Sequence, residues 1–311
     1  MRPLRGAHIT GWGSALPDKI VTNDDLAKSI DTSDAWIRER TGIQERRIGG
    51  TTAGLSAEAA RKALARAGCA PESIDLLILA TTTPDQHIPA TSAIVQHDLG
   101  LRCGAFDLNA ACSGFAYALV TAHALIQGGG LDRILVIGCD TLSRLTDWTD
   151  RGTAILFADG GGAVVLEASE DDTILGWDLG ADGAAAKILE CDIGGYLSMD
   201  GKEVFRRAVR AVVSSAEHAL KNAGVTAADI DWFIPHQANV RIMNSASDKI
   251  GIARERIVNV LTYTGNNSAG TIPLGLAAAA DDGRLKSGDL LLLSGFGAGM
   301  TWASVVLRWE P

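Results

Sequence analysis

The sequence is poor in aromatic side chains and has no long apolar run. Phe, Trp and Tyr together make up 5% of its 311 residues. No stretch of about 18 consecutive apolar residues occurs, which argues against a membrane-spanning helix. The first residues, MRPLRGAHITGWGSALP, also lack the apolar core of a secretory signal. We therefore expect a protein that is neither inserted into a membrane nor exported.

Basic residues and paired cysteines are also scarce. The 28 Lys and Arg residues face 37 Asp and Glu residues, and the net charge of -9 disfavours nucleic acid or an anionic membrane as a partner. No Cys-x-x-Cys pair is present, so we expect no zinc site. An odd number of cysteines argues against a secreted disulfide framework and favours a reducing, cytoplasmic setting. The five cysteines are Cys69, Cys103, Cys112, Cys139 and Cys191.

Small residues, by contrast, are abundant. The chain holds 35 glycines, and 47% of its residues are hydrophobic. This composition is typical of a compact α/β protein rather than a disordered or fibrous one. The length suits one large domain or two halves of about 150 residues each.

The chain repeats itself once. LSAEAARKALARAG has helical spacing and leads into ESIDLLILATTTP, while AVRAVVSSAEHALKNAG leads in the same way into AADIDWFIPHQAN. Asp75 and Asp231 correspond at an offset of 231 - 75 = 156. Asn109 and Asn266 follow at 266 - 109 = 157, as do the apolar segments DRILVIG and DLLLLSG. The common register over three elements indicates a duplication.

Each half is predicted to run helix, strand, helix, strand, strand. Apolar strands that alternate with helices imply a mainly parallel, buried sheet. We place the two halves at residues 1–172 and 173–311 and expect their central helices, which begin near Cys112 and Ala269, to pack together. Cys112 aligns with Ala269, so the scaffold does not itself require a cysteine there. If the two halves carry different reactive residues, a duplicated scaffold would bring those residues together at its internal twofold axis.

Cys112 lies in NAACSGF, at the predicted junction of a strand and a helix. Free cysteine is among the most buried residue types, so a structural role is one interpretation, and the one we favour for Cys69 and Cys139. At a helix start, however, unpaired N–H groups and the helix dipole lower the pKa of a thiol. The position, similar to a nucleophile elbow, therefore makes Cys112 a candidate nucleophile with a lowered pKa.

Two residues of the second half are candidates for the same site. His236 follows a predicted buried strand, 232–234, and so lies at the strand's carboxyl end, where sites form in open α/β sheets. Asn266 lies between a β-like stretch, 257–263, and a helix of small residues. A turn or an N-cap is the ordinary role of such an asparagine. Its alignment with the Cys112 loop makes it a candidate.

A glycine-rich segment and a basic cluster complete the candidates. GFGAG, 295–299, follows a predicted strand, but the next residues alternate like another strand, so we predict a tight β-turn and not a dinucleotide loop. The basic cluster is either a local docking site in an acidic protein or a solvated helix face. It consists of Arg206, Arg207 and Arg210 beside Phe205, with Arg241 further along.

Six motifs, in order along nearly the whole chain, resemble the β-ketoacyl-acyl carrier protein synthase III enzymes of the thiolase superfamily. The resemblance implies an α/β, thiolase-like duplicated five-layered αβαβα fold, in agreement with the repeat. The motifs are DTSDAWIRERTGI (31–43), AACSGF (110–115), DRGTAILFADGGGA (150–163), HQANVRI (236–242), GNNSAG (265–270) and GFGAGMTW (295–302).

The resemblance implies a reaction and the residues that perform it. Cys112 would accept the acyl group of an acyl-CoA primer, and backbone N–H groups of Cys112 and Ala298 would hold the oxyanion. Malonyl-acyl carrier protein would then lose carbon dioxide, with the enolate stabilised by His236 Nε2 and the Asn266 amide. The product would be a 3-oxoacyl-acyl carrier protein that initiates fatty-acid synthesis, and no metal or redox cofactor is implied.

The resemblance also implies substrate contacts. Trp36 and Arg151 match residues that sandwich the adenine of coenzyme A. Ile88 matches the position at which the partner subunit of a homodimer closes the acyl pocket, and a branched residue there would admit branched or longer primers. The 182–199 segment, which covers the channel in the family, looks shortened. The other implied contacts are Arg40 to the nucleotide, Ala238 and Asn239 along the pantetheine channel, Phe205 and Phe296 beside the substrate, and Arg206 and Arg241 towards the carrier protein.

Four other functions share part of this pattern. The alternative is a starter-unit ketosynthase or acyltransferase of a secondary-metabolite (polyketide) pathway, because the same triad would serve there. Acyltransferases that act on a hydroxyl or an amine often lack the asparagine at the position of Asn266 or the HQAN motif. This chain has both, which favours condensation. A non-catalytic partner subunit would lack Cys112. A degradative thiolase would need a second cysteine in the last strand-turn, which instead reads Gly297-Ala298-Gly299.

Overall fold

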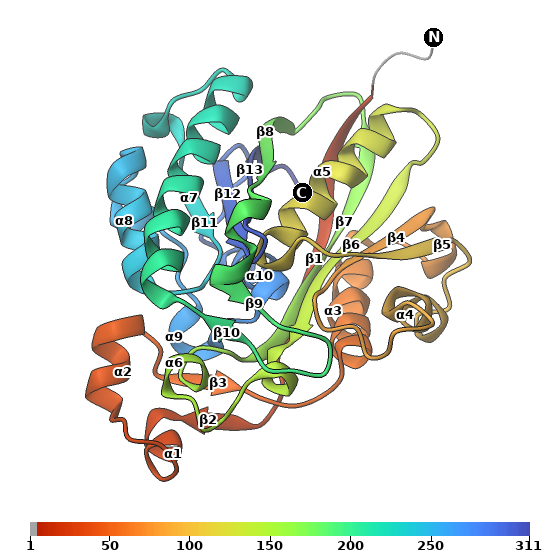
Figure 1. Ribbon diagram of the computed structural model, residues 1–311. Helices are drawn as coiled ribbons and strands as arrows, with labels where there is room; N and C mark the ends of the chain where they lie inside the picture. The colour runs from red at the N-terminus through yellow and green to blue at the C-terminus, as the bar shows by residue number, and fades with distance from the viewer. Residues whose placement is uncertain (1–4) are drawn as a thin grey trace.

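Two β-sheets, one from each half of the chain, divide the molecule into layers (Figure 1). This computed structural model describes residues 5–311. In the first sheet the strand order is β1-β7-β6-β4-β5, with β4 parallel to both neighbours and the β6–β7 and β7–β1 pairs antiparallel. The strands are β1 (Gly6–Ala15), β4 (Leu76–Ala80), β5 (Gly104–Leu108), β6 (Arg133–Thr141) and β7 (Asp159–Ser169).

The second sheet repeats this pattern with one strand fewer. Its order is β11-β12-β13-β8, with β11 parallel to β12 and the remaining pairs antiparallel. Leu76 pairs with Ile134 in the first sheet, and Trp232 pairs with Leu291 in the second, at the offsets read from the sequence. The proposed boundary at 172/173 lies between the last strand of the first sheet and β8. The strands are β8 (Ile174–Ala181), β11 (Trp232–Pro235), β12 (Leu290–Gly297) and β13 (Thr301–Arg308).

Side chains alternate between the two faces of each strand, so each sheet packs against helices on both sides. In β6, Leu135 packs in the apolar cluster under α3, while Val136 packs in the central cluster with α5. In β12, Leu293 faces the centre and Leu292 faces the α7 side. Figure 1 shows α7 and α8 at the left and α3 and α4 at the right. The helices are α3 (Thr52–Ala67), α4 (Thr91–Asp98), α5 (Gly114–Gln127), α7 (Gly201–Ala223), α8 (Val240–Ile250) and α10 (Thr271–Asp281).

The turns that precede the two central helices, α5 and α10, have the same backbone geometry. Asn109 Oδ1 accepts a hydrogen bond from Ala111 N at 3.1 Å, and Asn266 Oδ1 accepts one from Ser268 N at 2.9 Å. Ala111 and Ser268 have φ angles of 47° and 49°, the positive values among non-glycine residues of the described chain. A left-handed residue of this kind is uncommon, so the shared strain supports the predicted duplication. The turns are η2 (Ala111–Ser113) and η7 (Ser268–Gly270).

A smaller lobe lies at the bottom of Figure 1 and packs on the end of the second half. Ile37 and Ile43 of this lobe share an apolar cluster with Met243 of α8 and Leu261. It brings α2, and with it Trp36 and Arg40, to the mouth of the pocket described below. Its elements are α1 (Asn23–Ala27), α2 (Asp34–Thr41), β2 (Ile20–Thr22), β3 (Glu45–Arg47), α6 (Arg151–Ala154) and α9 (Leu261–Thr264).

Some elements differ from the sequence prediction. The 257–263 stretch is not a strand, because only Ile257 forms a β-bridge, to Phe233, before the chain turns into α9. The 182–199 segment forms a 3-10 helix and two short paired strands. No helix within residues 5–311 has the length and apolar character needed to span a membrane. The remaining elements are η1 (Pro71–Ser73), η3 (Leu142–Leu145), η4 (Gly183–Ile188), β9 (Leu189–Glu190), β10 (Ser198–Met199), η5 (Ala227–Asp229) and η6 (Arg254–Arg256).

Candidate active site

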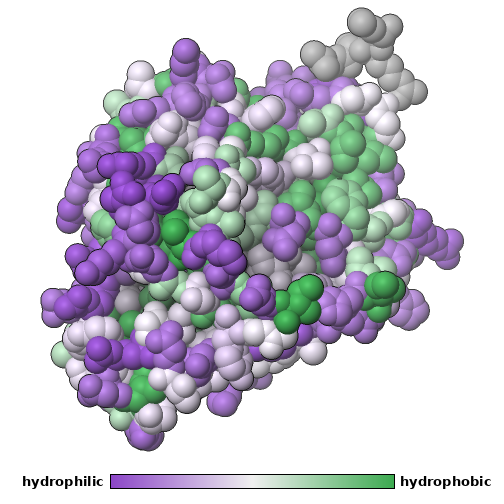
Figure 2. Space-filling view, in the orientation of Figure 1, coloured by the Kyte–Doolittle hydropathy of each residue, from purple (hydrophilic) through white to green (hydrophobic). Residues whose placement is uncertain are grey.

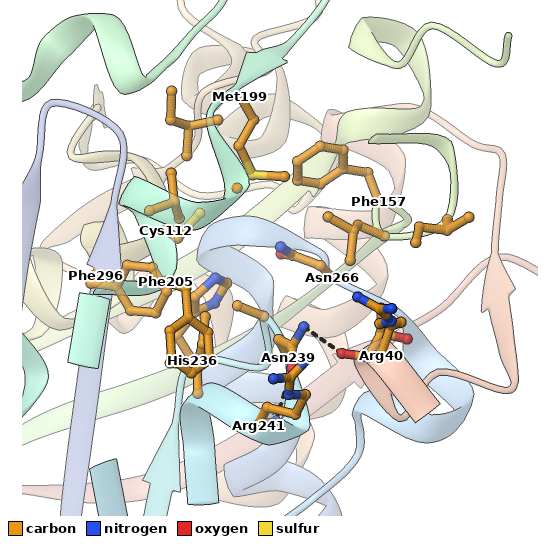
Figure 3. A pocket seen from close by; sticks show the side chains of 18 of the residues that line it. Arg40, Cys112, Phe157, Met199, Phe205, His236, Asn239, Arg241, Asn266 and Phe296 are labelled. Carbon is orange, nitrogen blue, oxygen red and sulfur yellow. Dashed lines mark hydrogen bonds between the residues drawn. The ribbon is translucent and has the colours of Figure 1, made fainter. Parts of the chain in front are cut away.

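A pocket of about 500 Å³ is lined by residues from both halves of the chain. Figure 3 shows Cys112, His236 and Asn266 around the same space, although they come from three separate segments. Phe296 of β12 lies beside them, with its ring centroid 5.4 Å from that of His236. The structure therefore brings together the three residues that the repeat and the motifs singled out.

Cys112 lies in η2, one turn before α5 begins at Gly114. The end of β12 runs so close to it that a Cβ added at Gly297 would lie 2.5 Å from Cys112 N. Burial raises the pKa of the Cys112 thiol to about 12, although a hydrogen bond with Ser268 acts in the opposite direction. The predicted direction of this pKa shift is therefore wrong, because burial raises the pKa more than the hydrogen bond with Ser268 lowers it.

His236 follows directly on β11, and its N–H donates to the Ser294 carbonyl oxygen of β12 at 2.7 Å. Its side chain is 2% exposed, and burial lowers the pKa of the imidazole to about 3, so the ring is neutral at physiological pH. Ring nitrogen Nδ1 lies 2.7 Å from Thr271 Oγ1 at the start of α10. Nε2 is therefore the ring nitrogen left for the pocket.

Gln237 explains why the His236 loop has a fixed shape. Its side chain is fully buried and donates to the carbonyl oxygens of Pro235 and Val258. Its amide oxygen accepts from the N–H groups of Val260 and Leu261. The glutamine of the HQAN motif thus ties the histidine to the start of α9 and does not line the pocket.

The side-chain amide of Asn266 has a defined orientation. Its Oδ1 is engaged by Ser268 N at 2.9 Å, which directs the Nδ2 donor away from that turn. The backbone of Asn266 pairs with the segment around Phe157: Asn266 N donates to the Leu156 carbonyl, and its own carbonyl accepts from Ala158 N. A second-half residue is therefore held by first-half backbone, and it presents an N–H donor to the cavity.

Asp140, at the end of β6, is a buried residue that sequence reasoning missed. Its carboxylate accepts hydrogen bonds from the hydroxyls of Thr81 and Thr83 and from the N–H of Thr82. It also accepts from Ala269 N at 3.1 Å, across the pseudo-twofold axis. The sequence signal that could have identified Asp140 is a carboxylate at the end of an apolar strand. It fixes the turn that carries Ser268 next to Cys112.

The predicted adenine-binding pair is closed in this structure. Arg151 lies over the Trp36 ring, 4.9 Å from its centroid, and Arg40 lies over the same ring at 5.5 Å. Arg151 also donates to the Asp31 carbonyl oxygen. Trp36 and Arg40 line the pocket, whereas Arg151 flanks it. An aromatic base could enter between Trp36 and Arg151 only if the guanidinium moved aside.

The predicted channel and docking residues lie along α8 and α7. Ala238 and Asn239 line the pocket, and Asn239 Nδ2 donates to the Arg40 carbonyl oxygen at 3.0 Å (Figure 3). Arg241 also lines the pocket and lies 5.8 Å from the centroid of the Phe205 ring. Arg206 lies outside the pocket, and its guanidinium is paired with Glu203.

Besides Arg151 and Arg206, two more predicted residues lie outside the pocket lining. Ile88 is 86% exposed. Ala298 lies in the β12–β13 turn, where the predicted strand-turn-strand is present, and Thr301 Oγ1 donates to its carbonyl oxygen. Ala298 does not have a positive φ, so alanine fits this turn without backbone strain. The described residues bring no group of three or more His, Cys, Asp or Glu side chains together as a metal site.

The apolar part of the lining was largely missed by sequence reasoning. Leu189 and Met199 come from the 182–199 segment. This segment was expected to cover the channel, but no residue in it was predicted to contact the substrate. Phe157 follows α6, and Figure 3 shows it opposite Cys112 with Met199 between them. The further lining residues are Thr41, Ile155, Leu156, Gly201, Lys202, Val204, Ile242 and Gly297.

The comparisons with known proteins agree with this geometry. Residues 106–191 match the family described as 3-oxoacyl-[acyl-carrier-protein (ACP)] synthase III, and residues 220–309 match its C-terminal unit. The β-ketoacyl-[acyl-carrier-protein] synthase III of Sinorhizobium medicae is 49% identical over 97% of this chain and 98% of its own length. That of Erythrobacter litoralis is 50% identical over 97% of this chain and 99% of its own length.

Solved structures show the same fold. The 3-oxoacyl-[acyl-carrier-protein] synthase III of Aquifex aeolicus superposes with a TM-score of 0.96 at 44% identity, covering 98% of this chain and 100% of its own. The priming β-ketosynthase of a polyketide biosynthetic pathway also reaches 0.96, at 35% identity over 100% of this chain and 98% of its own. The predicted thiolase-like fold is confirmed. The chain belongs to the 3-oxoacyl-[acyl-carrier-protein] synthase III family of acyl-transferring condensing enzymes.

Proposed function

We propose that this pocket condenses an acyl-CoA primer with malonyl-acyl carrier protein, releases carbon dioxide and forms a 3-oxoacyl-acyl carrier protein, the initiating step of fatty-acid synthesis. The observation that carries the proposal is the convergence of a thiol, a neutral imidazole and an oriented amide on one cavity. The reaction divides into an acyl transfer and a condensation, and Cys112 takes part in both.

In the acyl transfer, Cys112 Sγ attacks the thioester carbonyl of the acyl-CoA. His236 Nε2 takes the thiol proton and returns it to the sulfur of the departing coenzyme A, so the first product leaves as a thiol. The carbonyl oxygen becomes an oxyanion, which the N–H groups of Cys112 and Ala298 are proposed to hold. The close approach of Gly297 to Cys112 N supports this, because it brings the turn with Ala298 beside the nucleophile.

In the condensation, the malonyl thioester loses carbon dioxide, and negative charge develops on its thioester oxygen. Asn266 Nδ2 donates to this enolate oxygen, and His236 Nε2 donates as a second group when it carries a proton. Burial opposes protonation of His236, but an anion in the pocket favours it. The carbanion attacks the Cys112 thioester, and the released thiolate recovers its proton from Nε2, so each turnover consumes one solvent proton.

The pocket lining supports the proposed substrates. Trp36, Arg40 and Arg151 form a cationic and aromatic mouth that suits a nucleotide, with Arg151 displaced when the adenine enters. The path past Ala238 and Asn239, which line the pocket, suits a pantetheine arm. Arg241 lies beside this path, and hydrophilic side chains cover the face over α7 and α8 in Figure 2. We propose that Arg241 contacts the carrier protein, with Arg206 joining when it exchanges Glu203 for a carrier-protein carboxylate.

A homodimer belongs to the same proposal. Strand β5 is an edge strand, and its Phe106 is 37% exposed. Ile88 is exposed and does not line this chain's own pocket, so we propose that it closes the acyl pocket of the partner subunit. The chemistry as proposed uses no metal or redox cofactor. The five unpaired cysteines favour a reducing, cytoplasmic location.

An assay of purified protein with malonyl-acyl carrier protein and a set of acyl-CoA primers tests this function. We expect release of carbon dioxide and formation of the 3-oxoacyl product, with Cys112→Ala inactive. Full condensing activity in Cys112→Ala would refute the mechanism. If the enzyme instead accepted only primers used in polyketide assembly, the starter-unit alternative would be favoured. The lower identity of 35% to the priming ketosynthase argues against that alternative.

A further inference from the structure

His236 and Thr271 face each other at the buried end of the pocket. His236 Nδ1 lies 2.7 Å from Thr271 Oγ1, and the same oxygen lies 3.0 Å from the Ser268 carbonyl oxygen. Thr271 is fully buried and His236 is 2% exposed, so bulk water does not compete for these contacts. The mechanism described above assigns no role to Thr271.

The donor and acceptor capacities of these groups decide the direction of both hydrogen bonds. A carbonyl oxygen only accepts, so the Thr271 hydroxyl proton points at Ser268. The Thr271 oxygen then offers His236 only lone pairs, and Nδ1 must donate. The opposite arrangement would leave the Thr271 and Ser268 oxygens in contact without a hydrogen between them, which is costly in a buried place. A neutral imidazole carries one proton, so Nε2 is left with its lone pair.

We propose that Thr271 is a positioning residue that holds His236 in the Nδ1–H tautomer and so makes Nε2 a proton acceptor for Cys112. This inference rests on the proposed function. Cys112 is a thiol in the resting pocket, so it needs a base to become nucleophilic. The proton moves from Sγ to Nε2 as the new carbon–sulfur bond forms. It then passes to the coenzyme A sulfur as the old carbon–sulfur bond breaks, and Thr271 retains its own proton throughout.

The test compares Thr271→Val, which replaces the hydroxyl by a methyl group, with Thr271→Ser, which keeps the hydroxyl. Nitrogen-15 NMR of histidine-labelled enzyme reports which ring nitrogen carries the proton, and the signals absent from His236→Gln identify the residue. Acyl loading from acyl-CoA is timed by mass spectrometry, and decarboxylation of malonyl-acyl carrier protein is timed separately. Thermal unfolding confirms that each variant is folded.

We expect wild type and Thr271→Ser to show a protonated Nδ1 and an unprotonated Nε2. In Thr271→Val the proton shifts towards Nε2, and acyl loading slows by about 10- to 100-fold, within the contribution of a general base. Decarboxylation should slow less than loading, since it needs Nε2 as a donor. Recovery of loading in Thr271→Ser would assign the effect to the hydroxyl.

A protonated Nε2 in the resting wild-type enzyme would overturn the proposal, even if Thr271→Val failed to fold. Equal slowing of loading and decarboxylation in a folded Thr271→Val would also overturn it, because that is the signature of a merely structural residue. The failure of the proposed function would look different. Wild type would then not condense the substrates at all, while the tautomer of the resting enzyme could still be read.

Discussion

At the scale of single residues, burial keeps both partners of the proposed acyl transfer in their neutral forms. It raises the pKa of the Cys112 thiol to about 12 and lowers the pKa of His236 to about 3. The resting pair is therefore thiol and imidazole, and not thiolate and imidazolium. The nucleophile would then be generated only when a substrate is in place, which protects the sulfur from adventitious reaction.

The reactivity of Cys112 towards iodoacetamide should follow this raised pKa. A thiol reacts through its thiolate, whose fraction grows about tenfold per pH unit below the pKa. We expect the rate of Cys112 alkylation, measured by peptide mass spectrometry, to rise steadily from pH 7 to pH 9. Cys112→Ala gives the background from the other four cysteines. A rate that levels off below pH 8 would show that the helix start lowers this pKa after all.

Sequence reasoning reached the three reactive residues for physical reasons. The repeat aligns Cys112 with Ala269, so the cysteine is a residue in which the two halves differ. His236 directly follows an apolar strand. Thr271 and Asp140 stayed hidden because their hydrogen-bond partners are distant in the chain. The pKa of Cys112 was misjudged because a sequence shows a helix start but not the burial that raises the pKa of the thiol.

At the scale of elements, the site depends on how closely β12 approaches the turn η2. Gly297 lines the pocket where that strand passes the nucleophile, with no space for a side chain. An added Cβ would fall 2.5 Å from Cys112 N and 2.8 Å from Ala111 Cβ. The turn has little freedom to move, because Ala111 is already in the left-handed region.

Gly297→Ala should therefore cut acyl loading by about 10²-fold or more, the scale of losing one oxyanion donor. The matched control is Gly130→Ala, since an added Cβ there meets no atom within 4 Å. Loading rates and thermal unfolding of both variants check this. Near wild-type loading in Gly297→Ala would mean that the β12 approach does not shape the site.

Helices α3, α5, α7 and α10 and the inner strands of each half could be predicted because their apolar spacing is strong, whereas α4 and α8 were not predicted. Edge strands β1 and β8 were missed, since their burial depends on neighbours far along the chain. The 257–263 stretch has the composition of a strand but pairs only at Ile257, and Gln237 anchors the next residues to the histidine loop instead. Local composition cannot reveal such long-range anchoring.

At the scale of the whole molecule, the site was predicted as a meeting point of two halves, and residues of both halves line the pocket. Strand β5 has no counterpart in the second sheet, so its outer edge is left open to a partner. Ile88 is exposed and absent from this chain's pocket lining, so its proposed role at an acyl pocket requires a partner subunit. A single chain's sequence offers no direct signal for such a contact beyond the resemblance.

Light scattering after gel filtration should show a dimer that depends on β5. Phe106→Glu places a charge at the open edge and should shift the protein towards monomer, with a loss of activity that follows dissociation. The control is Trp177→Glu on β8, one of the two edge strands of the second sheet, because Trp177 is 41% exposed and Phe106 37%. A monomeric wild type, or equal effects of both substitutions, would contradict the β5 interface.

In the proposed reaction, Cys112 carries the acyl group between the two half-reactions. The most direct measurement mixes enzyme with an acyl-CoA, removes free substrate, adds malonyl-acyl carrier protein and follows the Cys112 peptide by mass spectrometry. We expect an acyl adduct on Cys112 that disappears at the rate at which 3-oxoacyl-acyl carrier protein appears. Product formation without this adduct, or an adduct that persists while product forms, would contradict it.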